Sequence, residues 1–108
     1  MEREINHWLI VAVVNQNYSD LLVQIANSAG ARGGTVLSGR NIDCEDSSEL
    51  LNLPVQSEKD IILLLVENEV SLGIMSAIDE NFGITSEAQG ILFSMPVDNV
   101  VGLNNDNN

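Results

Sequence analysis

Positive charge is scarce in this sequence. Four lysines and arginines stand against 16 aspartates and glutamates, which gives a formal net charge of -12. A surface this negative repels the phosphates of nucleic acids and the head groups of anionic lipids. Nucleic acids and membrane surfaces are therefore not expected as partners, and a protein partner would need a basic face.

Long apolar runs and cysteines are equally scarce. The longest apolar stretches, Trp8–Val14 and Ile61–Val66, are far shorter than the ~20 residues that a membrane-spanning helix needs. Cys44 is the single cysteine, so no disulfide can form within the chain. Residues 1–6 carry three charges and do not resemble a signal peptide. We expect a cytoplasmic protein without a membrane segment.

Catalytic and metal-binding patterns are missing as well. The single histidine, His7, and Cys44 have no second ligand at a metal-site spacing, and they do not suggest a nucleophile with its base. Four acidic residues lie close together: Asp43, Glu45, Asp46 and Glu49. They lack the spacing and the glycine of a calcium-binding loop, which indicates a solvated acidic segment. The sequence therefore predicts no metal site, no catalytic residue and no enzyme.

What the sequence does contain fits one globular domain. Its 108 residues are 44% hydrophobic, enough for a single core. Runs rich in Ile and Val predict strands, and apolar residues at helical spacing predict helices. The expected strands are His7–Asn15, Ala31–Asn41, Lys59–Glu67 and Ile91–Val97, and the expected helices are 17–29 and Glu69–Asn81. Asn17 or Ser19 should cap the first helix, while Gly30 and Gly83 should end the two helices.

This order of elements is that of the split βαβ arrangement. It predicts an α+β, ferredoxin-like βαββαβ sandwich, in which a four-stranded antiparallel sheet carries two helices on one face. Ile61–Val66 is apolar on both sides of its strand, so the other face of the sheet needs cover from a further subunit. Residues 41–58 form a long acidic loop with one short helical turn around 48–53. The domain is expected over 1–103, followed by a polar tail at 104–108.

Three stretches resemble the nitrogen regulatory protein PII family, in particular its PII-like subgroup. Gly30–Arg40 is similar to the family's second strand, Glu58–Ile61 with the aliphatic run after it resembles the third, and Gly90–Leu103 resembles the fourth. The resemblance implies a homotrimer whose sheets face inward, with adenine nucleotides bound between subunits. It also implies that the 41–58 loop contacts a protein target, through Asp43, Glu45, Asp46 and Glu49.

The sequence departs from the family in two places. The family's loop often carries a tyrosine that is nucleotidylated, but the 41–58 loop has none, and Tyr18 falls in the first predicted helix. Classical members hold phosphates with a lysine-rich loop before the last strand and with arginines after it. Here the stretch 83–90 has no lysine, and Gly102 and Asn104 stand where those arginines would be.

Eight residues are the candidate ligand contacts: Arg32, Gly34, Thr35, Arg40, Gly83, Thr85, Ser86 and Gly90. In a regular strand Arg32 and Arg40 would share one face, unless a glycine bulge lies between them. The 83–90 stretch could offer backbone amides to a ligand. The alternatives are structural ion pairs for the arginines and a plain helix end and turn for 83–90. Lys59 is expected to be solvated.

The function predicted is that of a PII-like signal transduction protein. It binds a small effector between subunits, such as ATP, ADP, AMP or a cyclic dinucleotide, and regulates a protein target, with nitrogen regulation as the family's role. Two alternatives stay open. One is a trimeric metal-related protein resembling CutA, which the scarcity of soft ligands disfavours. The other is an interaction module whose binding to its partner does not depend on nucleotides.

Overall fold

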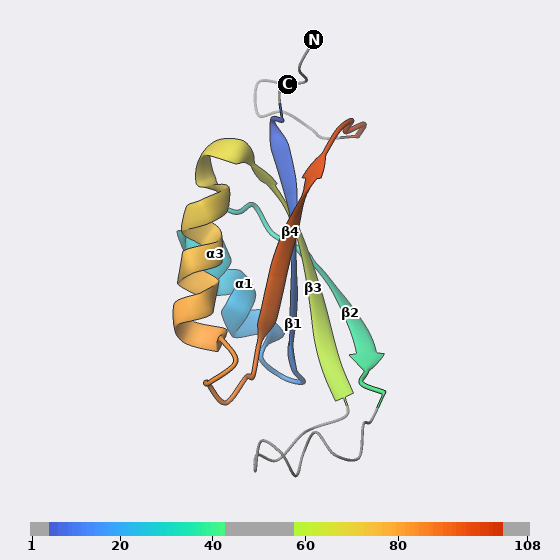
Figure 1. Ribbon diagram of the computed structural model, residues 1–108, viewed down its shortest axis with the longest axis vertical. Helices are drawn as coiled ribbons and strands as arrows, with labels where there is room; N and C mark the ends of the chain where they lie inside the picture. The colour runs from blue at the N-terminus through green and yellow to red at the C-terminus, as the bar shows by residue number, and fades with distance from the viewer. Residues whose placement is uncertain (1–4, 43–57, 103–108) are drawn as a thin grey trace.

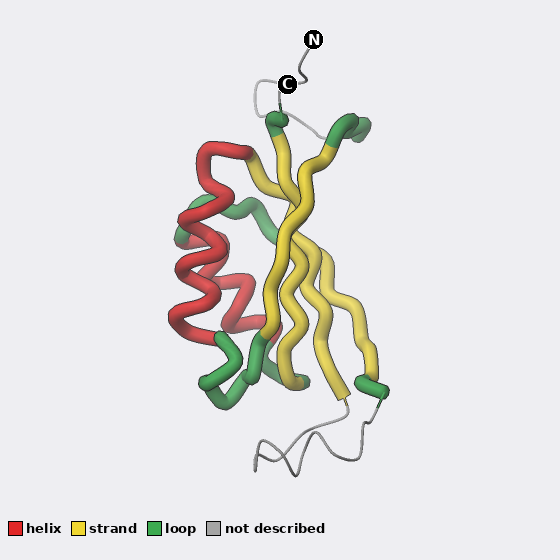
Figure 2. Tube along the Cα trace, in the orientation of Figure 1, coloured by secondary structure: helices red, strands yellow, loops and turns green. Residues whose placement is uncertain are grey.

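The computed structural model describes residues 5–42 and 58–102 of the chain (Figure 1). The elements follow in the order β1 (His7–Asn15), α1 (Ser19–Ser28), β2 (Thr35–Arg40), β3 (Glu58–Glu67), α3 (Asn68–Phe82) and β4 (Ile91–Val97). The strands form one antiparallel sheet in the order β2-β3-β1-β4. Both helices lie on the same side of it (Figure 2). The predicted α+β, ferredoxin-like βαββαβ sandwich is confirmed.

Several predictions concern residues outside the described ranges. They are the helical turn at 48–53, the four acidic residues of the 41–58 loop (Asp43, Glu45, Asp46 and Glu49) and the polar tail at 104–108. The extent of the domain, 1–103, also stays a prediction.

The core lies between the sheet and the helices. Successive side chains of a strand point to opposite faces, so alternate residues of β1 and β3 turn toward the helices. The register places Ile10 beside Leu64 and Ala12 beside Ile62, and all four side chains are fully buried. From the helices, Leu22, Ala26, Ile74, Ile78 and Phe82 complete this cluster. Each large aliphatic side chain buried in this way stabilises the fold by about 1.5–3 kcal/mol.

The helices are short, and within the described residues none is long and apolar enough to cross a membrane. Tyr18 takes the N-cap position of α1 without a side-chain capping bond, so the capping role predicted for Asn17 or Ser19 is wrong. Asn17 has a left-handed backbone, with φ of 82°, and its N–H donates to Asp60 Oδ2 at 3.1 Å. Asparagine tolerates this conformation better than most residues. The carboxylate of Asp60 thus binds the turn that leads into α1.

The strand β2 is shorter than the sequence predicts. The prediction was Ala31–Asn41, whereas β2 spans Thr35–Arg40. Gly33 has a left-handed φ of 87°, which interrupts the extended backbone before the strand. Gly34 lies so close to β3 that a Cβ atom there would be 2.6 Å from Leu64 Cδ2. Such a Cβ atom would also lie 3.2 Å from the Leu63 carbonyl oxygen, so the close packing of this segment on β3 explains a glycine at position 34.

The sheet face opposite the helices is apolar, and no described residue outside the sheet covers it. The strand register brings these side chains together on it: Leu9, Val11, Val13, Leu37, Ile61, Leu63, Leu65, Ile91, Phe93 and Met95. We call this surface the open face. Leu37, Ile91 and Phe93 are 47%, 58% and 46% exposed. The uncovered apolar face predicted from Ile61–Val66 is confirmed.

Candidate functional site

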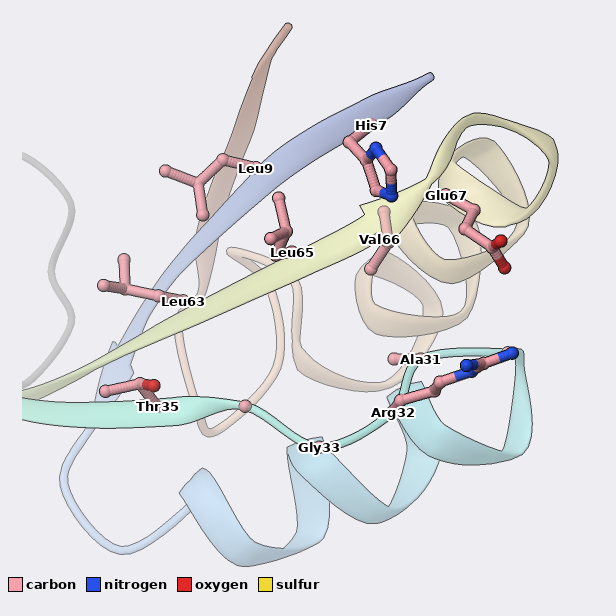
Figure 3. A pocket seen from close by; sticks show the side chains of 12 residues that line it. His7, Leu9, Ala31, Arg32, Gly33, Thr35, Leu63, Leu65, Val66 and Glu67 are labelled. Carbon is pink, nitrogen blue, oxygen red and sulfur yellow. The ribbon is translucent and has the colours of Figure 1, made fainter. Parts of the chain in front are cut away.

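A hollow of about 430 Å³ opens where β1 begins and β3 ends (Figure 3). Residues 31–34 do not pair with β3, which leaves space between this segment and the neighbouring strands. The lining consists of Gly30–Thr35 on one side, and His7, Leu9, Leu63, Leu65, Val66 and Glu67 on the other. We call this space the α1–β2 hollow.

The α1–β2 hollow combines charged groups with an apolar wall. Figure 3 shows the guanidinium of Arg32 and the carboxylate of Glu67 at one end of it, with leucine side chains toward the other. A guanidinium binds carboxylates and phosphates through parallel N–H donors. Leu63 and Leu65 offer a surface against which a flat ring can lie. The hollow therefore suits a ligand that carries both an anionic group and an apolar ring.

The 83–90 loop lies at the opposite end of the sheet, between α3 and β4 (Figure 1). Gly83 ends α3, as predicted, and its carbonyl oxygen accepts hydrogen bonds from the Ser86 amide at 2.9 Å and the Ser86 hydroxyl at 2.6 Å. The Gly90 amide donates to the carbonyl oxygen of Phe82 at 2.7 Å. A ligand that needs these donors has to displace bonds that the loop makes with itself.

A buried polar pair that the sequence patterns do not predict lies beside this loop. Lys59 is only 7% exposed, and its Nζ donates to Asn15 Oδ1 at 2.6 Å. The prediction that Lys59 is solvated is therefore wrong. Burial lowers the pKa of the Lys59 ammonium, because a charge is less stable away from water. The signal that could have found the pair is a polar residue at the end of each of two apolar strands.

The structure divides the eight predicted ligand residues between the two ends of the sheet. Arg32, Gly34 and Thr35 line the α1–β2 hollow. The others lie at the far end or in the loop there: Arg40, Gly83, Thr85, Ser86 and Gly90. Arg32 precedes β2, so it does not share a strand face with Arg40. Within one chain the eight residues do not form a single site, and their contact with a ligand stays a prediction.

The metal-binding alternative finds no support in the part of the chain that the structure describes. No group of three or more His, Cys, Asp or Glu side chains there could hold a metal ion. The acidic residues at 43–49 lie outside this part.

The sequence matches no protein-family model and no curated protein. Solved structures do match the fold. A PII-like signalling protein from Thermus thermophilus superposes with a TM-score of 0.65 at 19% identity, over 89% of this chain and 90% of the other. PII from Arabidopsis thaliana bound to citrate gives 0.70 at 18% identity, over 93% and 82%. A B. subtilis GlnK–ATP complex gives 0.63 at 14% identity, over 89% and 85%. The resemblance inferred from the sequence is confirmed at the level of the fold.

Proposed function

We propose that this chain, which shares the fold of PII signalling proteins, is a PII-like regulatory protein of the cytoplasm. It forms a homotrimer, binds a small effector between subunits and acts on a protein target through the 41–58 loop. The observation that carries the proposal is that Leu63 and Leu65 belong both to the open face and to the α1–β2 hollow. A subunit that covers the open face therefore also borders the hollow.

The open face supports the subunit contact. Monomeric proteins rarely leave a continuous apolar surface of this kind in water, and such a surface marks an interaction site. Homo-oligomers usually close by rotational symmetry. A homotrimer is the closed assembly that the resemblance to the PII family implies.

The effector of this proposal is an adenine nucleotide or a cyclic dinucleotide. Its base lies against Leu63 and Leu65, and its anionic part lies near Arg32, with Gly34 and Thr35 in the same wall. The solved complexes of GlnK with ATP and of PII with citrate support a small anionic effector on this fold. Because the 83–90 loop has no lysine, we expect Arg32 to supply the charge for the anionic group.

Ligand titration tests the proposal. We would follow thermal unfolding and calorimetric heat with ATP, ADP, AMP, cyclic di-AMP, citrate and 2-oxoglutarate. A ligand at 100 times its dissociation constant should stabilise the folded chain by about 2.7 kcal/mol. Arg32→Gln should abolish this gain, whereas Arg3→Gln, which makes the same change in net charge, should keep it. Absence of heat and of a thermal shift with every compound at millimolar concentration would contradict effector binding.

One observation favours a second function, that of an interaction module indifferent to nucleotides. The amide donors of Ser86 and Gly90 are engaged inside their own loop, and no lysine lies there to hold a phosphate. This function would be supported if the chain captures one defined target, if deletion of residues 44–56 abolishes the capture, and if no nucleotide changes it. A role in nitrogen regulation follows only from the family resemblance, and its test is whether 2-oxoglutarate alters target binding.

A further inference from the structure

A buried polar junction joins three segments at the end of the sheet opposite the α1–β2 hollow. Asn15, the last residue of β1, lies directly across from Lys59, the second residue of β3. Their exposed fractions are 4% and 7%. Because Lys59 follows residues 43–57 so closely, it marks the point where the chain returns from that segment into the sheet.

Asn15 uses both halves of its side-chain amide. Its Oδ1 accepts the hydrogen bond from Lys59 Nζ at 2.6 Å, and its Nδ2 donates to the carbonyl oxygen of Glu87 at 2.9 Å. Lysine can only donate and a carbonyl oxygen can only accept, so one orientation of the amide satisfies both partners. The backbone N–H of Asn15 also donates to the carbonyl oxygen of Ala88, at 2.8 Å. Asn15 Nδ2 also donates to Gln89 Oε1 at 3.4 Å, so the 83–90 loop is held to β1 through this one residue at three points.

Burial makes this junction costly to open. A buried ammonium needs a partner, because it has given up its hydration. Among the described residues, Asn15 is the hydrogen-bond partner found for Lys59. The next residue, Asp60, points to the helix side and accepts the Asn17 amide at 3.1 Å. The first residues of β3 therefore bind the end of β1 through Lys59 and the turn that follows β1 through Asp60.

We infer that Asn15 is a positioning residue, which fixes the 83–90 loop relative to Lys59 and so to the start of β3. The inference goes beyond the proposed function, since it needs neither an effector nor a partner. If that function holds, the start of β3, which directly follows the loop proposed to contact the target, is connected to the 83–90 loop through this side chain. A displacement at the start of β3 would reach the 83–90 loop through two hydrogen bonds of one buried side chain.

Hydrogen–deuterium exchange of the full-length chain tests this inference. Asn15→Asp keeps an acceptor for Lys59 but cannot donate to the carbonyl oxygen of Glu87 or to Gln89 Oε1. We expect the amides of 83–90 to exchange about five- to tenfold faster in this variant, as for the loss of one buried hydrogen bond. Exchange at 83–90 within twofold of wild type, in a chain whose circular dichroism is unchanged, would overturn the inference.

A double-mutant cycle shows whether Lys59 acts through Asn15. Lys59→Met removes the ammonium at similar length and should raise exchange at 83–90 by about two- to fivefold, because Asn15 loses the partner that orients it. The Asn15→Ala/Lys59→Met double variant should exchange no faster than Asn15→Ala alone. Independent, additive effects would contradict transmission from Lys59. Should Asn15→Ala fail to fold, Asn15→Asp takes its place in both the single and the double variant of the cycle.

Asn27→Ala is the matched control. It also removes a bond between an asparagine side chain and a loop, since Asn27 Oδ1 accepts the Gly33 amide at 2.8 Å. That bond lies at the other end of the sheet, beside the α1–β2 hollow. Faster exchange should appear at Gly33 and not at 83–90. A rise at 83–90 equal to that in Asn15→Asp would show general loosening and overturn the specific role of Asn15.

Discussion

The two faces of the sheet are built from alternate residues of the same strands, yet they differ in what covers them. On the helix side, Ile10, Ile62 and Leu64 are fully buried. On the open face, Leu65 and Met95 remain 39% and 43% exposed. Even-numbered positions of β1 and β3 therefore build the core of one chain, whereas odd-numbered apolar positions of the same strands lie on the face that no helix covers. Each face can be disturbed without touching the other.

The largest effect should come from the covered face. Leu64→Ala removes a fully buried side chain from the core and should lower the free energy of unfolding by about 2–5 kcal/mol. Leu65→Ala, one residue away on the open face, should cost less than half as much when both are measured in urea on dissociated chains. Equal losses would mean that the two faces do not differ in the single chain.

Next in size is a change at the edge of the sheet. Gly34→Ala would place a Cβ atom 2.6 Å from Leu64 Cδ2 and 3.2 Å from the Leu63 carbonyl oxygen. We expect a loss of about 1–3 kcal/mol, as for an overpacked core. Gly73→Ala in α3 is the control, because nothing lies within 4 Å of its added Cβ. Gly73→Ala should stabilise the helix by about 0.5–1 kcal/mol. A lower free energy of unfolding in both variants would contradict the close packing at Gly34.

A substitution on the open face should change the free energy of unfolding of the single chain very little and should weaken the association of subunits. Phe93→Glu puts a charge where a partner subunit would lie. Its cost to the isolated chain should stay within about 0.5 kcal/mol, as is usual for surface substitutions, while light scattering should show a fall in mass. Leu72→Glu changes an 80% exposed side chain of α3 and should leave the mass unaltered. If Phe93→Glu keeps the mass of the wild-type assembly, the open face is not the surface where subunits meet.

The smallest effect concerns Lys59 and its dependence on pH. Burial lowers the pKa of this ammonium in the folded chain below the ordinary 10.5. Between the lowered pKa and 10.5 the unfolded chain binds more protons than the folded one, so the free energy of unfolding gains a contribution that rises with pH. Lys59→Met should remove that rise, as urea unfolding between pH 8 and pH 10.5 would show. An identical slope in both proteins would mean that Lys59 is not desolvated by folding.

Local patterns were enough to predict most of the fold. β1 and β4 have the predicted bounds, because each is a mainly apolar stretch whose ends are marked by polar or glycine residues. The order of elements then implied the topology. The start of β2 was beyond such patterns, because the sequence does not show which glycine takes a left-handed φ; Gly33 does, and its amide donates to Asn27 Oδ1 instead of pairing with a strand. The glycines of this stretch indicated irregular backbone between Arg32 and Arg40, but not the residue at which the strand begins.

The candidate site was predicted less completely than the fold. The hollow around Arg32 depends on the segment before β2 and on β3, which are far apart in the sequence. The burial of Lys59 depends on the pairing of β1 with β3 and on the neighbouring 83–90 loop. From composition alone, a single lysine in an acidic chain is expected at the solvent-exposed surface. Only the register of β1 and β3 shows that Lys59 lies across from Asn15.

The mass of the wild-type chain in solution tests the central claim, that the open face is where subunits meet. Sedimentation equilibrium at micromolar concentration and moderate salt should give three times the mass of one chain. A mass of one chain, independent of concentration, would contradict the homotrimer and with it the effector site between subunits.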